Sequence, residues 1–289
     1  MRRLVVPSLA LLLVGAVVGA CNGTTGDQLF TFPAYAAGAT DAGHPFSSNG
    51  FTIQLTSAQM YLGAVYVNEA PAQNGSTFNT PACIDTGIYC AQVPGGVEVN
   101  LLSATPQPFS VQGSASADLG QSWQLYLVDG DVNEPTTFGV PNTADIAGTA
   151  TRQSDGKVFS WAATITINPE NRGEAAQNAG QPGANPICQQ RIINFAGLDL
   201  PLSPGGSMLL TIDPRAWFTL PIDFSTLPSI TSPECTLDQS SMYPPSAEYC
   251  IPDSSNLPGS DLGSEQGVNL FTGMFDSGSA GFALTYSSP

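Results

Sequence analysis

The sequence predicts an all-β protein, an antiparallel β-sandwich with long irregular loops and mostly one domain. Apolar residues alternate with polar ones over many short runs, and these runs are rich in β-branched and aromatic residues. Gly, Pro, Asn and Asp separate the runs, and no window shows an amphipathic helix longer than two turns. Many short strands joined by turns are typical of two packed antiparallel sheets.

The expected strands begin at residue 29. The clearest pair is a hairpin in which residues 147–152 and 157–167 flank Ser154-Asp155-Gly156, because Asp-Gly supplies the positive φ angles of a tight turn. The other expected strands are residues 29–32, 51–55, 59–67, 97–101, 109–117, 123–128, 193–198, 208–212 and 282–286.

Short helical turns and irregular stretches interrupt this pattern. Pro214 is suited to the first position of a helical turn, and residues 269–275 carry one apolar helical face. Residues 168–187 are a candidate sub-boundary or exposed loop, and the Pro-rich residues 225–267 form a coil. Because long irregular loops are often functional, we expect a recognition surface in the coil 225–267.

The first 21 residues are typical of a bacterial lipoprotein signal. Arg2 and Arg3 precede an apolar run at residues 4–18, which is too short to span a membrane comfortably. Gly19 and Ala20 then precede Cys21, as in the lipobox, where the cysteine sulfur is acylated and the preceding peptide bond is cut. We therefore expect a signal peptide at residues 1–20, a palmitate-bearing Cys21, a tether at 21–28 and a β-sandwich domain at 29–289.

Charge limits the partners of the mature chain. Without residues 1–20, five basic residues face 23 acidic ones, a formal charge of −18. Nucleic acid and anionic membrane surfaces are therefore poor partners. No second apolar run approaches the roughly 20 residues of a spanning helix, so membrane attachment is expected through the lipid alone.

The remaining five cysteines suggest disulfides, which an oxidising compartment favours. The simplest pairing joins Cys83 with Cys90 and Cys235 with Cys250, since short loops close at the lowest entropy cost. Cys188 would then keep a free thiol, although its pairing with Cys235 or Cys250 stays open. Metal ligation by these thiols is disfavoured, because the chain has a single histidine and no Cys-x-x-Cys.

A short acidic segment is the best candidate cation site. Asp129, Asp131 and Asn133 place oxygen ligands at alternate positions, as in the first half of a calcium loop. Glu134 stands where such a loop has glycine, and Val140 replaces its final acid. The alternative is a polar turn in which these side chains cap backbone amides. We expect no cofactor, and calcium is the cation expected if any binds.

Complete catalytic motifs are absent from the sequence. Ser154-x-x-Lys157 matches the nucleophile pattern of penicillin-binding enzymes, but it falls on the predicted hairpin turn and its partner motifs do not occur. A Ser-His-acid triad has only His44 available. Paired carboxylates for glycoside hydrolysis stay an alternative, because their separation depends on the fold.

The three tryptophans, Trp123, Trp161 and Trp217, lie within apolar runs. We expect them in the core, since a buried aromatic ring removes a large apolar area from water. Trp217 is the one that could instead line a pocket, because it follows the short helical turn opened by Pro214.

Several segments resemble uncharacterised bacterial envelope lipoproteins and, more distantly, the methanobactin-associated periplasmic copper proteins. The segments are residues 60–67, the strand 208–212 running into Asp213 and Trp217-Phe218, Asp223-Phe224-Ser225, and Asn269-Leu270-Phe271. The resemblance implies an all-β extracytoplasmic fold. Copper ligands do not carry over, because the histidines usual in that family are missing and its four-cysteine pattern is only partly matched.

These observations predict a lipid-anchored, non-enzymatic binding or structural module of the bacterial cell envelope. Asn22 replaces the Asp that retains enteric lipoproteins in the inner membrane, which favours the outer membrane. The expected partners are the membrane, through the N-terminal lipid, and an envelope protein or glycan. The alternatives are a metal-dependent protein, calcium-binding or copper-associated, and a carboxylate-based glycan hydrolase.

Overall fold

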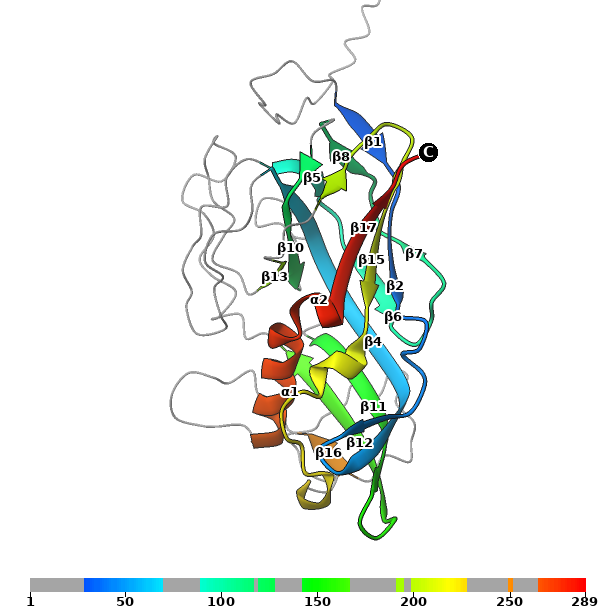
Figure 1. Cartoon of the computed structure of the whole chain (residues 1–289), viewed down its shortest axis with the longest axis vertical. Helices are drawn as coiled ribbons and strands as arrows, with labels where there is room; N and C mark the ends of the chain where they lie inside the picture. The colour runs from blue at the N-terminus through cyan, green and yellow to red at the C-terminus, as the bar shows by residue number, and fades with distance from the viewer. Residues whose placement is uncertain are drawn as a thin grey trace, which may run out of the picture.

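The structure is a computed structural model, which describes residues 29–69, 89–116, 119–127, 142–166, 191–194, 199–227, 249–251 and 265–289. These residues form an all-β fold, and the predicted β-sandwich is confirmed (Figure 1). A large sheet packs against a four-stranded sheet, with the main hydrophobic core between them.

Strand β4 (Phe51–Asn68) is the axis of the large sheet and runs along most of the molecule (Figure 1). It joins two runs that the sequence analysis expects as separate strands, 51–55 and 59–67. The register between β4 and β11 (Asn142–Arg152) shifts by one residue at Thr56, so a β-bulge accommodates the extra residue between the two runs. Gly148 lies opposite this bulge, where a Cβ atom would overlap the carbonyl oxygen of Gln54.

The neighbours of β4 lie along its two edges. Along one edge are three short strands, β3 (Phe46–Ser48), β6 (Val97–Asn100) and β5 (Tyr89–Val93). Along the other edge are β11 (Asn142–Arg152) and β10 (Ser122–Leu127). The sheet continues outward through β8 (Gly113–Ala115) and β1 (Phe30–Phe32) beside β5, through β12 (Val158–Thr166) and β16 (Tyr249–Ile251) beside β11, and through β13 (Arg191–Asn194) beside β10.

The second sheet has the order β17 (Phe282–Ser287), β15 (Ser207–Ile212), β2 (Ala34–Gly38) and β7 (Gln107–Pro108). Its pairs are antiparallel except β15 with β2, which is parallel, as is β12 with β16 in the large sheet. A separate two-stranded sheet joins β9 (Leu119–Gly120) to β14 (Leu200–Pro201).

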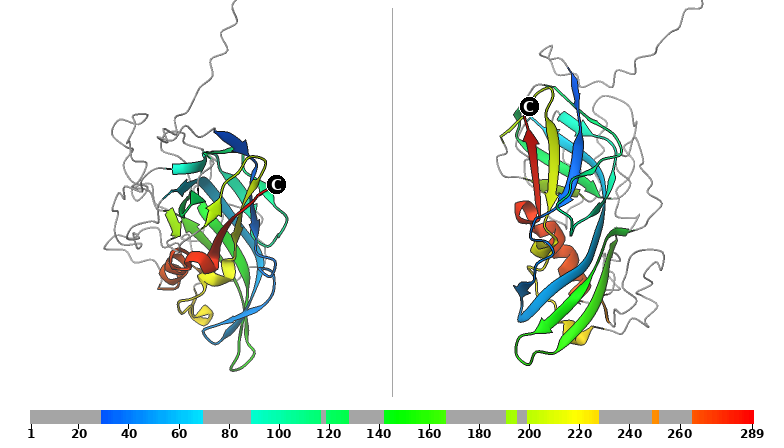
Figure 2. Two further views of the ribbon diagram at one scale, coloured as in Figure 1. Left: turned by 45° about the horizontal axis from the view of Figure 1, so that its top comes forward. Right: turned by 90° about the vertical axis from the view of Figure 1, so that its right-hand side faces the viewer.

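The expected hairpin is present as β11 and β12, and its tip projects at the end of the molecule opposite β1 (Figure 2). Gly156 takes the positive φ of 71° that the turn requires. Arg152 donates two hydrogen bonds to Asp155, at 2.9 and 2.6 Å, and these lower the pKa of Asp155 to about 2. Ser154 and Lys157 therefore belong to a surface turn, as predicted.

The helical segments are partly as expected. Pro214 opens the 3-10 helix η2 (Pro214–Trp217), whose N-cap Asp213 accepts a hydrogen bond from the backbone N–H of Arg215. The expectation of at most two helical turns is wrong for α1 (Glu265–Asp276), which has 12 residues. Two glycines lower the intrinsic helix propensity of this segment, and packing against η2 compensates for that loss. The short helix α2 (Gly278–Gly281) connects α1 to β17.

The predicted coil 225–267 is only partly described. Its first residues belong to the 3-10 helix η3 (Phe224–Thr226), its last residues open α1, and β16 lies within it at the edge of the large sheet. In the described ranges, no helix has the length and hydropathy needed to cross a membrane.

Candidate functional site

The two faces of the large sheet differ in chemistry where β4 lies beside β10. Val65, Val67, Trp123 and Leu125 belong to the main core between the sheets. The residues that alternate with them project to the other face, because successive strand residues point to opposite sides. We call this set the tyrosine–amide face, and with one neighbour from β5 it consists of Tyr66, Asn68, Tyr89, Ser122, Gln124 and Tyr126.

The tyrosine rings form a compact group of their own. Tyr66 and Tyr126 make a second buried cluster with Ala64, separate from the main core, and Tyr89 packs against it. The Tyr66 ring lies 4.6 Å from Tyr89 at an interplanar angle of 34°, and 5.3 Å from Tyr126 in an edge-to-face arrangement. Three tyrosine rings therefore pack together at one strand junction.

The amide side chains lie on the same strand junction as these rings. Ser122 is opposite Asn68 and Gln124 is opposite Tyr66 in the β4–β10 register. Asn68 donates a hydrogen bond to the Ser122 hydroxyl at 3.1 Å. Asn68, Ser122 and Gln124 are all fully buried.

Gln124 is the unusual member of this face. Within the described part of the chain, neither its amide nitrogen nor its amide oxygen has a hydrogen-bond partner, and the Asn68 carbonyl oxygen also lacks one. A buried polar group without a partner costs about 1–3 kcal/mol, and few are found in native proteins. Among the described residues the Gln124 amide therefore keeps its donors and its acceptor unused, and an apolar side chain of the same shape is expected to be more stable there.

Two pairs of polar side chains lie farther along the same face of the sheet. Gln59 donates to Glu98 at 3.0 Å, and Thr164 donates to Asp145 at 3.0 Å. Gln59 and Asp145 are themselves mostly buried and opposite each other in the β4–β11 register. The Thr143 hydroxyl on β11 is also buried without a partner among the described residues, and Gln124 differs from it because both polar atoms of its amide lack one.

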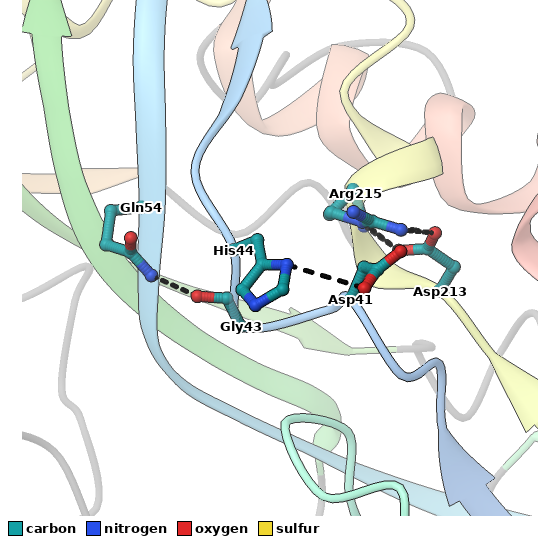
Figure 3. Close-up of polar contacts among 6 residues, drawn as sticks. All are labelled: Asp41, Gly43, His44, Gln54, Asp213 and Arg215. Atoms are coloured by element: carbon teal, nitrogen blue, oxygen red, sulfur yellow. Dashed lines mark hydrogen bonds and ion pairs between the residues drawn. The ribbon is translucent and has the colours of Figure 1, made fainter.

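The only histidine belongs to a polar cluster between the β2–β3 connection and η2 (Figure 3). His44 Nδ1 lies 3.4 Å from an Asp41 carboxylate oxygen, and both side chains are well exposed. Arg215 binds the Asp213 carboxylate at 2.7–3.1 Å, and these hydrogen bonds raise the pKa of Arg215. Asp213 is occupied as helix cap and as ion-pair partner of Arg215, so these contacts hold the start of η2 in shape.

All three tryptophans lie in the main core, as the sequence predicts. Trp217, the one that could have lined a pocket, is fully buried and stacks on Phe282 with ring centroids 6.3 Å apart. It therefore serves packing between η2 and the second sheet.

Several predicted sites fall outside the described residues. Those are the predicted lipidation site Cys21, the acidic segment with Asp129, Asp131, Asn133 and Glu134, and the cysteines Cys83, Cys188 and Cys235. Cys250 is described in its backbone only. Cys90 is fully described and buried, and its thiol lies 3.6 Å from the carbonyl oxygen of Val67. The disulfides and the calcium site stay predictions, and no group of three metal-ligating side chains occurs among the residues that the structure describes.

The sequence analysis missed the tyrosine–amide face, although a signal for it is present. Residues 65–68 read Val-Tyr-Val-Asn and residues 122–126 read Ser-Trp-Gln-Leu-Tyr, so each segment alternates large apolar residues with polar or phenolic ones. Such alternation is ordinarily taken as core against solvent. That every residue of β10 is buried is visible only in the structure.

Comparison with protein-family models, with curated proteins and with solved structures finds no match. The class of the protein is therefore defined by its own fold, an all-β sandwich with a buried polar and aromatic layer on the face of its large sheet that points away from the main core.

Proposed function

We propose that this protein is a lipid-anchored lipoprotein of the bacterial cell envelope, with the outer membrane as its expected location. We also propose that its β-sandwich is a non-enzymatic binding module. The observation that carries the binding role is the fully buried Gln124 amide without a partner on the tyrosine–amide face. Ligand sites combine apolar and aromatic walls with a few polar groups that fix orientation, and this face has that composition.

The chemistry of the face favours an uncharged ligand rich in hydroxyl groups, such as a neutral glycan. Its six side chains carry only phenol, hydroxyl and amide groups. Gln124 offers two donors and one acceptor, and the free Asn68 oxygen offers a second acceptor. An extended peptide would bind along a sheet edge, and an amphipathic helix would require an apolar groove, so the middle of a polar sheet face suits neither.

Replacing Gln124 by Met is expected to stabilise the protein without ligand. Met has nearly the same shape as Gln and removes both unpartnered amide atoms, so the free energy of unfolding should rise by about 1–3 kcal/mol. Urea unfolding of the domain at residues 22–289 measures the change. The same variant should lose binding to neutral gluco-, xylo- or chito-oligosaccharides in titration calorimetry, because it removes the hydrogen-bonding group.

Gln153→Met is the matched control, since Gln153 is exposed at the hairpin turn and its amide makes only two long, exposed hydrogen bonds, at 3.3 and 3.5 Å. This variant should keep binding and change stability by less than about 0.5 kcal/mol. A loss of stability in Gln124→Met would show that the amide is satisfied in the free protein and would remove the basis of the proposal. Equal sugar binding by wild type and Gln124→Met would place the ligand elsewhere.

The anchor makes an independent prediction. Cys21→Ser removes the sulfur that the lipid requires, so the protein should move from the membrane fraction to the soluble fraction of disrupted cells. Mass spectrometry of the N-terminal peptide should find palmitate on wild type only. A Cys21→Ser protein that stays fully membrane-bound would contradict a lipid anchor at this residue.

A further inference from the structure

We propose that the end of the sandwich formed by β1, β8 and β9 rests on the lipid surface that holds the anchor, so that the β11–β12 hairpin tip points away from the membrane. This inference rests on the proposed lipidation of Cys21. Its other elements are the strand register, the reach of the chain and the distribution of exposed apolar and basic side chains.

The register places β1 and the hairpin tip at opposite ends of β4. Phe30 pairs with Ala115, Ala115 with Ala91, and Ala91 with Val67, so β1 is level with the last residues of β4. At the other end, Arg152 pairs with Phe51, the first residue of β4. Figures 1 and 2 show the same separation, with β1 at one end and the hairpin tip at the other. Eighteen residues of strand span at most about 60 Å, at about 3.3 Å per residue.

The chain from the anchor enters at the β1 end. Leu29 is eight residues after Cys21, and eight residues reach at most about 28 Å. This is roughly half the length that β4 spans, so the tether keeps the β1 end within a short distance of the lipid surface and lets the hairpin tip lie much farther away.

Exposed apolar side chains gather in the same half of the molecule. The described residues include four large hydrophobic side chains that are exposed, and three of them, Leu29, Val111 and Leu119, are next to or within β1, β8 and β9. Leu29 is 40% exposed and Leu119 is 42% exposed. Contacts of this size are weak, but the tether raises the effective concentration of the lipid surface to the millimolar range, so a weak contact is enough.

Among the side chains that the structure describes, no basic group lies near this contact. The basic residues with described side chains are Arg152 and Lys157 at the hairpin and Arg215 in η2, and none of them lies at the β1 end. The described contact is apolar, so on uncharged phosphatidylcholine vesicles the orientation should not depend on salt.

The orientation can be measured through Lys157, because it is the only lysine of the chain. The full-length lipidated protein is labelled at Lys157 with an amine-reactive donor dye and reconstituted into phosphatidylcholine vesicles that contain an acceptor lipid. The double variant Lys157→Arg, Ser288→Lys moves the single lysine to the β1 end. Ser288 directly follows β17, whose last residues pair with the start of β15, and the start of β15 pairs with the start of β2. Intact mass confirms one dye per molecule.

We expect energy transfer to be several-fold stronger from residue 288 than from Lys157, with no change between low and high salt. Adding Leu29→Ser and Leu119→Ser should raise transfer from Lys157, because the domain then tumbles on its tether. Equal transfer from both positions in vesicle-bound protein would overturn the orientation and leave the anchor intact. Failure of the full-length protein to bind vesicles would overturn the anchor itself, and the orientation with it.

Discussion

Trp161→Ala should lower the free energy of unfolding by about 3–5 kcal/mol, the usual cost of removing a fully buried tryptophan. Trp161 projects from β12 into the main core and is fully buried. Its ring lies 5.7 Å from Phe218 and 5.3 Å from Phe224, which belong to the segment from η2 to η3. The side chain therefore joins the large sheet to the irregular segment that covers it, and the cavity left by alanine would loosen both.

Trp161→Phe separates the packing of the ring from its polar atom. The indole nitrogen of Trp161 is buried and has no hydrogen-bond partner among the described residues, so phenylalanine removes an unpaired donor while keeping an aromatic ring. The loss of stability should be clearly smaller than for alanine. Val158→Ala, at a residue that is 57% exposed on the same strand, should change stability by less than about 0.5 kcal/mol. A urea-unfolding loss below about 1 kcal/mol for Trp161→Ala would contradict the described core.

The fold class could be predicted from the sequence because the patterns that indicate it are local. Alternation over residues 208–212 and 282–286, and the Asp-Gly turn between residues 152 and 157, depend only on neighbouring residues. The structure confirms these strands and the hairpin.

Elements stabilised by distant contacts were missed. Strand β2 has the sequence Ala-Tyr-Ala-Ala-Gly, which shows little alternation, and it forms because β15 pairs beside it in parallel. Helix α1 is longer than the one apolar face expected at residues 269–275. Gly267 and Gly273 weaken its local propensity, and its full length depends on packing against η2.

The candidate site was hidden for a related reason. An amide on a strand that alternates with Trp and Leu is expected to face water, and its burial follows from the whole fold. The residues that the sequence singles out have plain roles where the structure describes them: Trp217 packs in the core, and His44 pairs with Asp41 at the surface. Rare residue types such as Trp217 and His44 therefore did not indicate the candidate site. The burial of Gln124 did, and the structure was needed to see it.

Gly273→Ala should destabilise the protein by about 1–3 kcal/mol, the usual cost of overpacking, although it replaces a helix-interior glycine. In an exposed helix this change stabilises by about 1 kcal/mol, because alanine has the higher helix propensity. Here a Cβ atom at residue 273 would overlap the backbone carbonyl oxygen of Trp217, and a backbone group cannot turn aside as a flexible side chain can. Helix α1 is also held to the neighbouring segment by Asn269, which donates to the carbonyl oxygen of Pro221 at 2.6 Å.

The sign of the change therefore decides whether α1 packs as closely on η2 as described. Gly43→Ala is the matched control, because nothing lies within 4 Å of a Cβ atom there and its φ is not positive, so stability should change by less than about 0.5 kcal/mol. Thermal and urea unfolding of both variants give the comparison, and a stabilised Gly273→Ala would contradict the close approach. If Gly273→Ala loses stability, Gly273 both weakens the local helix propensity of α1 and allows α1 to pack closely on η2. The helix then depends on the tertiary fold.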